Sequence, residues 1–299
     1  KTYFNSLLKI QVIFSLFIKV IKLICKIYWM DDHVYKTPMT AFKLKYPIIL
    51  IHGTAAGDSS LFWGRIPKTF KKNNISFFYG KTDGWGTVAN NAQMLKRNLS
   101  DLAEKTGATK FNLIAHSKGG IDARHFISTL NGHQMVASLS TISTPHLGTP
   151  IADYLMEKHL SRDCVTKKLI QRLSFLFRGQ SPAPIELIRD LSVKEMRVFN
   201  QLNPNMDNVF YQSFASTMNK PQDDLLYALS FKYLRRLVGE NDGMVPLESA
   251  VWGANFKHIH ASRGISHAGI TDVTRKNIGN VHIPQIYLDI IRGLGALGL

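Results

Sequence analysis

Short apolar runs recur along the chain, and helical stretches separate several of them. The runs lie at Pro47–Ile51, Ser76–Tyr79, Phe111–Ala115, Val136–Ile142, Asn208–Phe214 and Phe256–Ile259. Between them, Val88–Thr106 and Lys118–Leu130 have the length and apolar spacing of helices. Strands that alternate with helices are typical of a mostly parallel sheet that helices cover on both faces. The order of these segments therefore predicts an α/β fold.

The composition fits a folded domain and narrows the class of partner. An apolar share of 45% in 299 residues is ample for a core and excludes a disordered or fibrous chain. The cysteines, Cys25 and Cys164, form no CxxC pair, which excludes a disulfide framework and a cysteine-based zinc module. The net charge is +16, but no nucleic-acid-binding motif accompanies it, so we expect no nucleic-acid partner. A negatively charged membrane surface or a plain lysine-rich surface are the two remaining explanations.

Residues 1–33 read as an accessory segment that precedes one α/β domain over residues 34–299. Residues 1–30 hold five lysines and no acidic residue. On a helix, one narrow stripe is polar and the opposite side is apolar (Gln11, Ser15, Lys19, Lys22 and Lys26 against Ile13, Phe17, Val20, Ile21, Ile24 and Tyr28). The longest charge-free run, Ile10–Ile18, is too short to span a membrane. We expect a basic amphipathic helix that lies in a membrane interface or packs on the domain.

The spacing between strands lengthens once, over residues 150–205. The sequence there is helical, with one apolar face and one polar face (Val165, Leu169, Leu173 and Leu176 against Lys167, Lys168, Gln171 and Arg172). Phe175 and Phe177 add more apolar surface than one helix face can bury. We expect a helical insertion over the carboxyl edge of the sheet, acting as a lid that opens or, alternatively, as a fixed cap.

A serine turn follows the third apolar run. Ala115-His116-Ser117-Lys118-Gly119 stands between a strand and a helix, with a small residue two positions before and two positions after the serine. That spacing permits a sharp strand–turn–helix elbow, which lifts a serine hydroxyl above the sheet and points a helix N-terminus at it. Ser117 is therefore the candidate nucleophile.

A serine hydroxyl needs a base to take its proton, and eleven histidines compete for that role. His267 lies in a loop of small residues after the last strand, which suits a chain order of nucleophile, acid and base. His146, after another strand, is the second choice. We expect His116 to pack beside its strand, and His258 and His260 to be structural.

The base in turn needs an acid that orients its ring, and the best candidate is Asp242. It lies in the loop Glu240-Asn241-Asp242-Gly243, ahead of the histidine in the chain. Glu240 is the neighbouring alternative, and an ordinary Asp-Gly turn is the alternative to any catalytic role.

A tetrahedral oxyanion needs backbone donors. One is the amide of Lys118, directly after Ser117 at the start of a helix. The second is the amide of Thr54, because His52-Gly53-Thr54 follows the first strand and Gly53 allows close approach.

Together these elements resemble the bacterial true lipases, triacylglycerol lipases of the α/β-hydrolase superfamily. The similar stretches are Tyr46–Gly53, Phe111–Arg124, Ser143–Pro150, Leu191–Asn200 and Asn241–Val245. The resemblance implies an α/β-hydrolase fold with a lid, a triad of Ser117, Asp242 and His267, and an oxyanion hole of Thr54 and Lys118. It also implies a lipase or esterase that cleaves lipid-like acyl esters through an acyl-enzyme, outside the cell or at a membrane surface.

The sequence departs from the family at its calcium site. Many of these lipases hold calcium through an aspartate two residues after the catalytic histidine, where this chain has Gly269. Asp272 is near but does not match that position, so we expect no obligatory metal and no cofactor. On the helix after the elbow, Asp122 and Arg124 are expected to take part in a structural ion pair.

Three other functions stay open at this point. An acyltransferase would pass the acyl group to an alcohol instead of water. A polyesterase, such as a polyhydroxyalkanoate-type depolymerase, would need residues 151–200 to leave the site uncovered. A non-enzymatic membrane-binding protein would use residues 1–30 for attachment, and it is disfavoured because every triad element is present.

Overall fold

A six-stranded parallel sheet forms the centre of the protein in the computed structural model, which describes residues 44–157 and 183–299. Its strands are β1 (Ile48–Ile51), β2 (Phe77–Tyr79), β3 (Phe111–His116), β4 (Val136–Ile142), β5 (Phe210–Ser216) and β6 (Asn255–Ile259). Their spatial order is β2-β1-β3-β4-β5-β6, and every neighbouring pair is parallel. All six strands lie on the apolar runs, so the predicted α/β fold is confirmed.

Helices follow most of the strands. They are α2 (Ser60–Trp63), α3 (Ile66–Lys72), α4 (Val88–Thr106), α5 (Lys118–Thr129), α6 (Pro150–Leu155), α8 (Pro184–Asp190), α9 (Val193–Leu202), α10 (Ala228–Leu237) and α11 (Ile283–Ala296). The 3-10 turns are η1 (Gly132–Gln134), η3 (Pro221–Asp223), η4 (Glu248–Ala250) and η5 (Gly269–Thr271). Local signals set the ends of the longest helix: the Thr87 hydroxyl caps the first turn of α4, and Gly107 ends it at φ 71°, a conformation that favours glycine.

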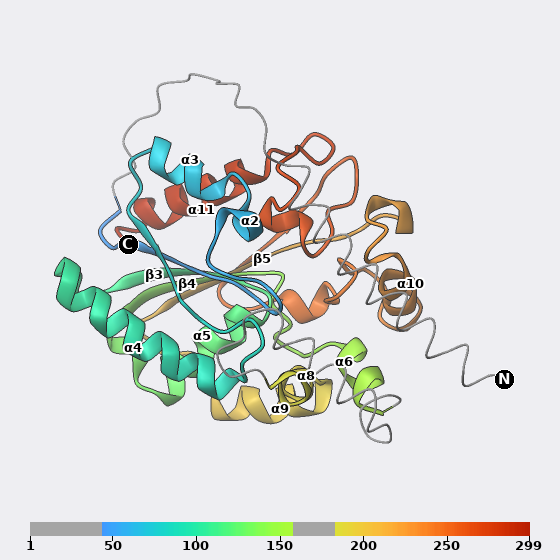
Figure 1. Ribbon diagram of the computed structural model, residues 1–299, viewed down its shortest axis with the longest axis horizontal. Helices are drawn as coiled ribbons and strands as arrows, with labels where there is room; N and C mark the ends of the chain where they lie inside the picture. The colour runs from blue at the N-terminus through green and yellow to red at the C-terminus, as the bar shows by residue number, and fades with distance from the viewer. Residues whose placement is uncertain (1–43, 158–182) are drawn as a thin grey trace. The chain divides into compact units, whose positions relative to one another are not determined.

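The central strands β1, β3 and β4 are buried on both faces, which explains their nearly continuous apolar sequences. Figure 1 shows α3 and α11 over one face and α4 and α5 over the other. Alternate β1 residues enter the two cores: Ile48 and Leu50 pack with the α3 and α11 side, and Ile49 and Ile51 with the α4 and α5 side. The layers hold the carboxyl ends of β1, β3 and β4 at one edge, where the candidate residues follow their strands.

The described parts of the insertion at residues 150–205 are helical and consist of α6, α8 and α9, which contact one another. Residues 158–182, which carry the predicted lid helix, lie outside the described residues, as does the predicted helix of residues 1–33. In the described ranges, no helix is both long enough and apolar enough to cross a membrane. The lid and the N-terminal helix stay predictions.

Candidate active site

Ser117 occupies a strained turn between β3 and α5. Its backbone lies at φ 54° and ψ −132°, a region that residues with a side chain rarely adopt. Two glycines make the turn possible, because an added Cβ on Gly119 would lie 2.4 Å from the carbonyl oxygen of His52. A Cβ on Gly53 would lie 2.6 Å from that of Ser117. Close packing thus requires glycine at positions 119 and 53.

Three predicted residues meet at this turn. The distance between Ser117 Oγ and His267 Nε2 is 2.9 Å, and that between His267 Nδ1 and Asp242 Oδ2 is 2.8 Å. All three residues are buried, with exposures of 7%, 8% and 1% for Ser117, His267 and Asp242. The contacts form a relay in which the serine hydroxyl can donate to the ring and the ring to the carboxylate.

The second carboxylate oxygen of Asp242 also accepts hydrogen bonds. Its Oδ1 accepts hydrogen bonds from the backbone amides of Met244 at 2.9 Å and Val245 at 2.8 Å. The backbone amide of His267 also donates to the carbonyl of Asp242 at 2.9 Å. Glu240, the alternative acid, is exposed, so the structure brings Asp242 to the ring and leaves Glu240 aside.

His146, the alternative base, lies in a different environment. Its ring is buried, contacts Thr141 Oγ1 at 3.0 Å and stacks on Trp252 with 5.1 Å between ring centroids. Burial, together with the nearby Arg124, lowers the pKa of His146 well below its ordinary value. These contacts describe a packed structural histidine, not a partner of Ser117.

His258 and His260, expected to be structural, and His116, expected to pack beside its strand, each contact a neighbouring residue. His258 Nε2 contacts Thr217 Oγ1 at 3.1 Å, and its ring centroid lies 3.9 Å from that of His260. His116 is buried beside its strand as expected, and its Nε2 also lies 3.0 Å from the carbonyl oxygen of His267. This contact joins positions 151 residues apart, and no local pattern in the sequence signals it.

The two expected oxyanion donors come from separate elements. Thr54 follows β1, and Lys118 is the first residue of α5. Within the described part of the chain, neither backbone amide donates to another residue. Two free amides beside a serine hydroxyl suit a site that receives a negatively charged oxygen.

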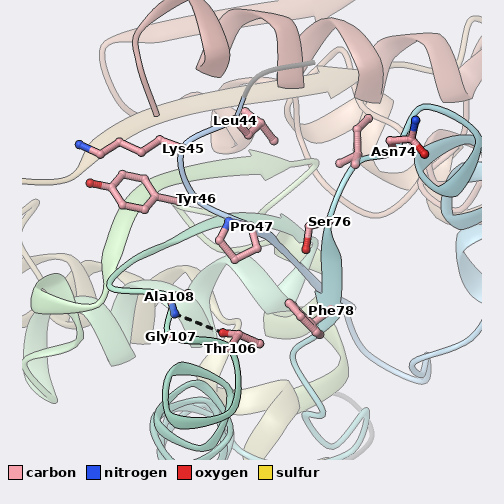
Figure 2. Close-up of a pocket in the computed structure, with 11 residues that line it drawn as sticks. Leu44, Lys45, Tyr46, Pro47, Asn74, Ser76, Phe78, Thr106, Gly107 and Ala108 are labelled. Atoms are coloured by element: carbon pink, nitrogen blue, oxygen red, sulfur yellow. Dashed lines mark hydrogen bonds between the residues drawn. The ribbon is translucent and has the colours of Figure 1, made fainter. Parts of the chain in front are cut away.

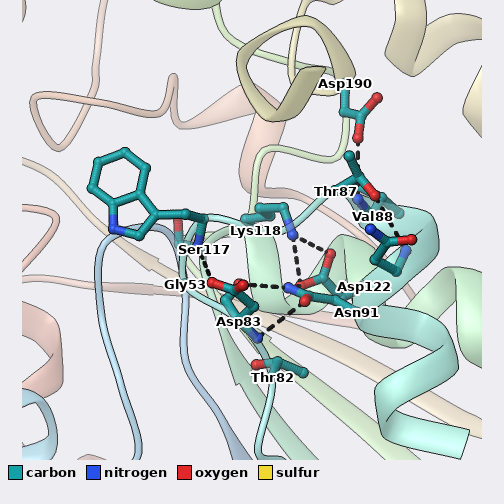
Figure 3. A network of polar contacts seen from close by, with 12 residues as sticks. Gly53, Thr82, Asp83, Thr87, Val88, Asn91, Ser117, Lys118, Asp122 and Asp190 are labelled. Carbon is teal, nitrogen blue, oxygen red and sulfur yellow. Dashed lines mark hydrogen bonds and ion pairs between the residues drawn. The ribbon is translucent and has the colours of Figure 1, made fainter. Parts of the chain in front are cut away.

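Only the backbone amide of Lys118 is expected in the oxyanion hole. Its side chain points into the protein (Figure 3). Its Nζ lies 2.6 Å and 2.9 Å from the two carboxylate oxygens of Asp122, and both side chains are 1% exposed. Asn91 Nδ2 donates to the same carboxylate at 2.8 Å. The predicted ion pair of Asp122 is therefore present, and its cation is Lys118.

Arg124 does not take part in an ion pair with any described carboxylate, which corrects the expectation for this residue. Its guanidinium carbon lies 3.6 Å from the ring centroid of Trp252, and its NH1 donates to Asn200 Oδ1 at 2.8 Å. Burial lowers the pKa of Arg124 to about 9. The residue is held by aromatic stacking and neutral acceptors, which sequence spacing does not reveal.

Tyr227 is a neighbour of the site that the sequence did not indicate. Its ring centroid lies 6.3 Å from that of His267, at an interplanar angle of 73°. Burial and the nearby carboxylates of Asp224 and Asp242 raise its pKa. It immediately precedes α10 and packs over Gly243.

Asp272, the aspartate that follows the family's calcium-ligand position in the sequence, is bound by an arginine. The buried Asp272 carboxylate binds Arg65, with an NH2–Oδ1 distance of 2.7 Å and an Nε–Oδ2 distance of 2.9 Å. The described residues contain no group of three or more histidine, cysteine, aspartate or glutamate side chains that could hold a metal ion. The absence of an obligatory metal stays a prediction.

One surface pocket of about 380 Å³ lies elsewhere (Figure 2). Residues from the segment before β1, from β2 and the segment before it, and from the end of α4 line it (Leu44–Pro47, Asn74–Ser76, Phe78 and Thr106–Ala108). It opens near the amino ends of β1 and β2, whereas Ser117 follows the carboxyl end of β3. This pocket is therefore separate from the serine site.

Comparisons with known proteins agree on the fold. The family model described as palmitoyl protein thioesterase matches residues 47–261. Triacylglycerol lipase 2 of Saccharomyces cerevisiae is 29% identical over 199 residues, which cover 64% of this chain and 57% of that protein. A triacylglycerol lipase of Pseudarthrobacter phenanthrenivorans is 34% identical over 121 residues, covering 38% of this chain and 37% of that protein. The chain thus spans about half the length of the first relative and less of the second.

Solved structures extend the likeness over most of the chain. The mature Bacillus licheniformis lipase BlEst2 has a TM-score of 0.61 and 23% identity, covering 88% of this chain and 98% of that one. The Staphylococcus hyicus lipase has a TM-score of 0.64 and 16% identity, with coverages of 88% and 98%. The metagenomic carboxyl esterase MGS0156 has a TM-score of 0.68 and 15% identity, with coverages of 88% and 79%. At these identities the structures show the fold alone.

Proposed function

The chain belongs to the palmitoyl protein thioesterase family, and we propose that it is a serine-dependent hydrolase of lipid-like acyl esters. The resemblance to lipases and the α/β-hydrolase fold, both expected from the motifs, are confirmed by the curated relatives and the solved structures. The observation that carries the proposal is the relay from Ser117 through His267 to Asp242 at 2.9 Å and 2.8 Å.

The first half of the reaction forms an acyl-enzyme. Ser117 Oγ attacks the ester carbonyl while His267 Nε2 takes its proton, and Asp242 stabilises the positively charged ring. The amides of Thr54 and Lys118 bind the oxyanion of the tetrahedral intermediate. The C–O bond of the leaving alcohol then breaks, and His267 returns the proton to that oxygen.

The second half repeats the chemistry with water. His267 takes a proton from a water molecule, which attacks the acyl carbonyl, and the acid is released as the proton returns to Ser117 Oγ. Each group needed for this cycle is a side chain or a backbone amide of this chain, so we propose that it proceeds without a cofactor. We also propose work at a lipid interface, with contact through residues 1–30, on the basis of their lysines and amphipathic pattern.

A second candidate substrate class is the long-chain acyl thioester, which the family model favours. The same acyl-enzyme forms, but the leaving group is a thiol with an ordinary pKa of about 8.5, which departs without full protonation. A thioesterase would therefore depend less than an esterase on proton donation by His267.

The test compares the parent and Ser117→Ala on p-nitrophenyl esters from acetate to palmitate and on a palmitoyl thioester of N-acetylcysteamine. Serine-dependent ester hydrolysis that rises toward long chains supports a lipase. Activity limited to short esters supports an esterase or polyesterase, and turnover of the thioester alone supports a thioesterase. Product analysis with an added alcohol separates hydrolysis from acyl transfer. Equal rates in the parent and Ser117→Ala would contradict the proposal.

A further inference from the structure

The two oxyanion donors belong to separate segments of the chain, so their spacing has to be fixed by something other than the chain between them. The amide of Thr54 follows β1, and the amide of Lys118 begins α5. An oxyanion hole stabilises a transition state only when its donors are already placed at the position of the developing charge. A misplacement of about 1 Å can cost on the order of 100-fold in rate.

We propose that a buried bracket of Lys118, Asp122, Asn91 and Asp83 positions the oxyanion hole by joining the segments that carry its two amides. This inference rests on the serine hydrolase mechanism proposed above. It makes the Lys118 side chain a positioning group, distinct from the catalytic role of the same residue's backbone amide.

The first link of the bracket lies on α5. Lys118 and Asp122 are four residues apart on one helix face, and the Nζ contacts both carboxylate oxygens at 2.6 Å and 2.9 Å. The lysine side chain is thereby tied to the next turn of its own helix. Because the pair is almost fully buried, water cannot replace either partner, and the pair has one well-defined geometry.

The second link joins α5 to the segment after β2 through Asn91, on α4 (Figure 3). The Nδ2 group of Asn91 donates to Asp122 at 2.8 Å and to the Asp83 carbonyl at 2.9 Å. Its Oδ1 accepts from the Asp83 amide at 3.0 Å. The side-chain amide is therefore fixed on both its nitrogen and its oxygen.

The third link reaches the segment that carries Thr54. The Ala55 amide donates to the Gly84 carbonyl at 2.9 Å, next to Asp83 in the chain. The His52 ring contacts the carbonyls of Thr82 at 3.1 Å and Gly53 at 2.9 Å. Hydrogen bonds, together with the backbone of residues 82–84, thus connect Lys118 to the residues on both sides of Thr54.

The pKa of Asp122 is set by its burial and by its partners in the bracket. Burial raises the pKa of the Asp122 carboxyl, and Lys118 and Asn91 counter that rise. Two well-packed apolar residues would stabilise the fold about as well as a buried ion pair does. Defined geometry is the property that an apolar pair would not supply, and geometry is what an oxyanion hole needs.

The experiment measures three quantities on the whole chain: the rate at which a fluorophosphonate probe labels Ser117, and kcat and KM for a p-nitrophenyl ester. The probe forms a tetrahedral adduct, so its rate reports on the oxyanion hole whatever the natural substrate is. The variants are Lys118→Met, Asn91→Ala and the double variant Lys118→Met/Asp122→Leu. Lys96→Met, an exposed lysine on α4, is the matched control.

We expect Lys118→Met to lower kcat and the labelling rate by about 10- to 100-fold with KM changed less than about 3-fold. Asn91→Ala, which keeps the ion pair, should give a smaller loss of the same kind. The double variant should regain thermal stability, because no buried charge is left unpaired, while kcat and labelling stay low. Lys96→Met should behave as the parent.

Recovery of kcat and labelling together with stability in the double variant would overturn the inference, because the ion pair would then be structural only. Unchanged kcat in Lys118→Met or Asn91→Ala would overturn it as well. These outcomes leave the hydrolase proposal intact, since the parent still turns over the ester. A parent that neither hydrolyses the ester nor reacts with the probe would instead contradict the proposed function, and the inference with it.

Discussion

His116 holds the backbone of His267, 151 residues away in the chain, through a 3.0 Å contact between its Nε2 and the His267 carbonyl oxygen. The residue that precedes the candidate nucleophile thus braces the candidate base. Burial, together with the nearby His267 ring, lowers the pKa of His116 well below its ordinary value, so the ring stays neutral and its Nε2–H donates to the carbonyl. The sequence predicts that this side chain packs beside its strand, and it gives no sign of the contact with His267.

We predict that His116→Phe lowers kcat/KM about fivefold, because it removes one buried hydrogen bond, typically about 1 kcal/mol, from the loop that carries the base. Steady-state kinetics on a soluble p-nitrophenyl ester measures the loss. His116→Gln is the matched control, since its amide can still donate to the carbonyl, and it should recover most of the rate. Equal losses of kcat/KM in both variants would contradict the bracing role of His116.

We predict that Asp242→Asn and His267→Ala each cut turnover by up to ~10⁴-fold, because the serine hydroxyl then lacks an oriented base. His146→Ala should keep most of the activity of the parent, since the His146 ring packs on Trp252. Rates on one ester, with circular dichroism to show that each variant is folded, give the comparison. Loss of activity in His146→Ala with activity retained in His267→Ala would reverse the assignment of the base.

Acid should weaken the fold through the buried histidines. The folded-state pKa of His146 lies well below 6.5, while the unfolded chain has the ordinary value, so the unfolded state binds more protons as the pH falls. Stability is therefore present above the unfolded pKa and is lost as the pH falls below it. Over pH 7 to 5, one such histidine contributes a loss of at most about 2 kcal/mol.

We predict that His146→Gln reduces the difference in unfolding free energy between pH 7 and pH 5 by up to about 2 kcal/mol. Urea unfolding at the two pH values measures it. The remaining pH dependence should include the contribution of His116, which is also buried and neutral. An unchanged pH dependence in His146→Gln would show that His146 titrates normally in the folded protein.

Much of the fold and the candidate nucleophile could be predicted from local sequence patterns. The central strands β1, β3 and β4 could be predicted because strands buried on both faces are runs of apolar residues. Ser117 could be predicted because its small neighbours lie within two positions of it. The contact pattern of Asp242 and His267 agrees with the expected one, and their catalytic roles stay predictions.

What the sequence did not reveal depends on tertiary packing. The spacing of Lys118 and Asp122 is visible, but their burial is not, and Asn91 looks like any polar residue on a helix surface. Arg124 was expected in an ion pair, yet an aromatic ring and neutral oxygens hold it. No local pattern encodes such contacts, because they form only when distant segments pack.

We predict that chelation by EDTA leaves both activity and melting temperature unchanged. The proposed mechanism requires no metal, and the carboxylate of Asp272, which follows His267 in the chain, is bound by Arg65 at 2.7 Å. Ester hydrolysis and thermal melting with EDTA, and then with added calcium, check this. A loss with EDTA that calcium restores would reveal a metal site that the account does not contain.

The central claim is that Ser117 carries the acyl group during turnover. The most direct measurement is mass spectrometry of the protein quenched during hydrolysis of a p-nitrophenyl ester, with Asp242→Asn included to slow the cycle. The account predicts a single added acyl group on the peptide that contains Ser117, and none in Ser117→Ala. An acyl group on another residue, or ester turnover that persists in Ser117→Ala, would contradict it.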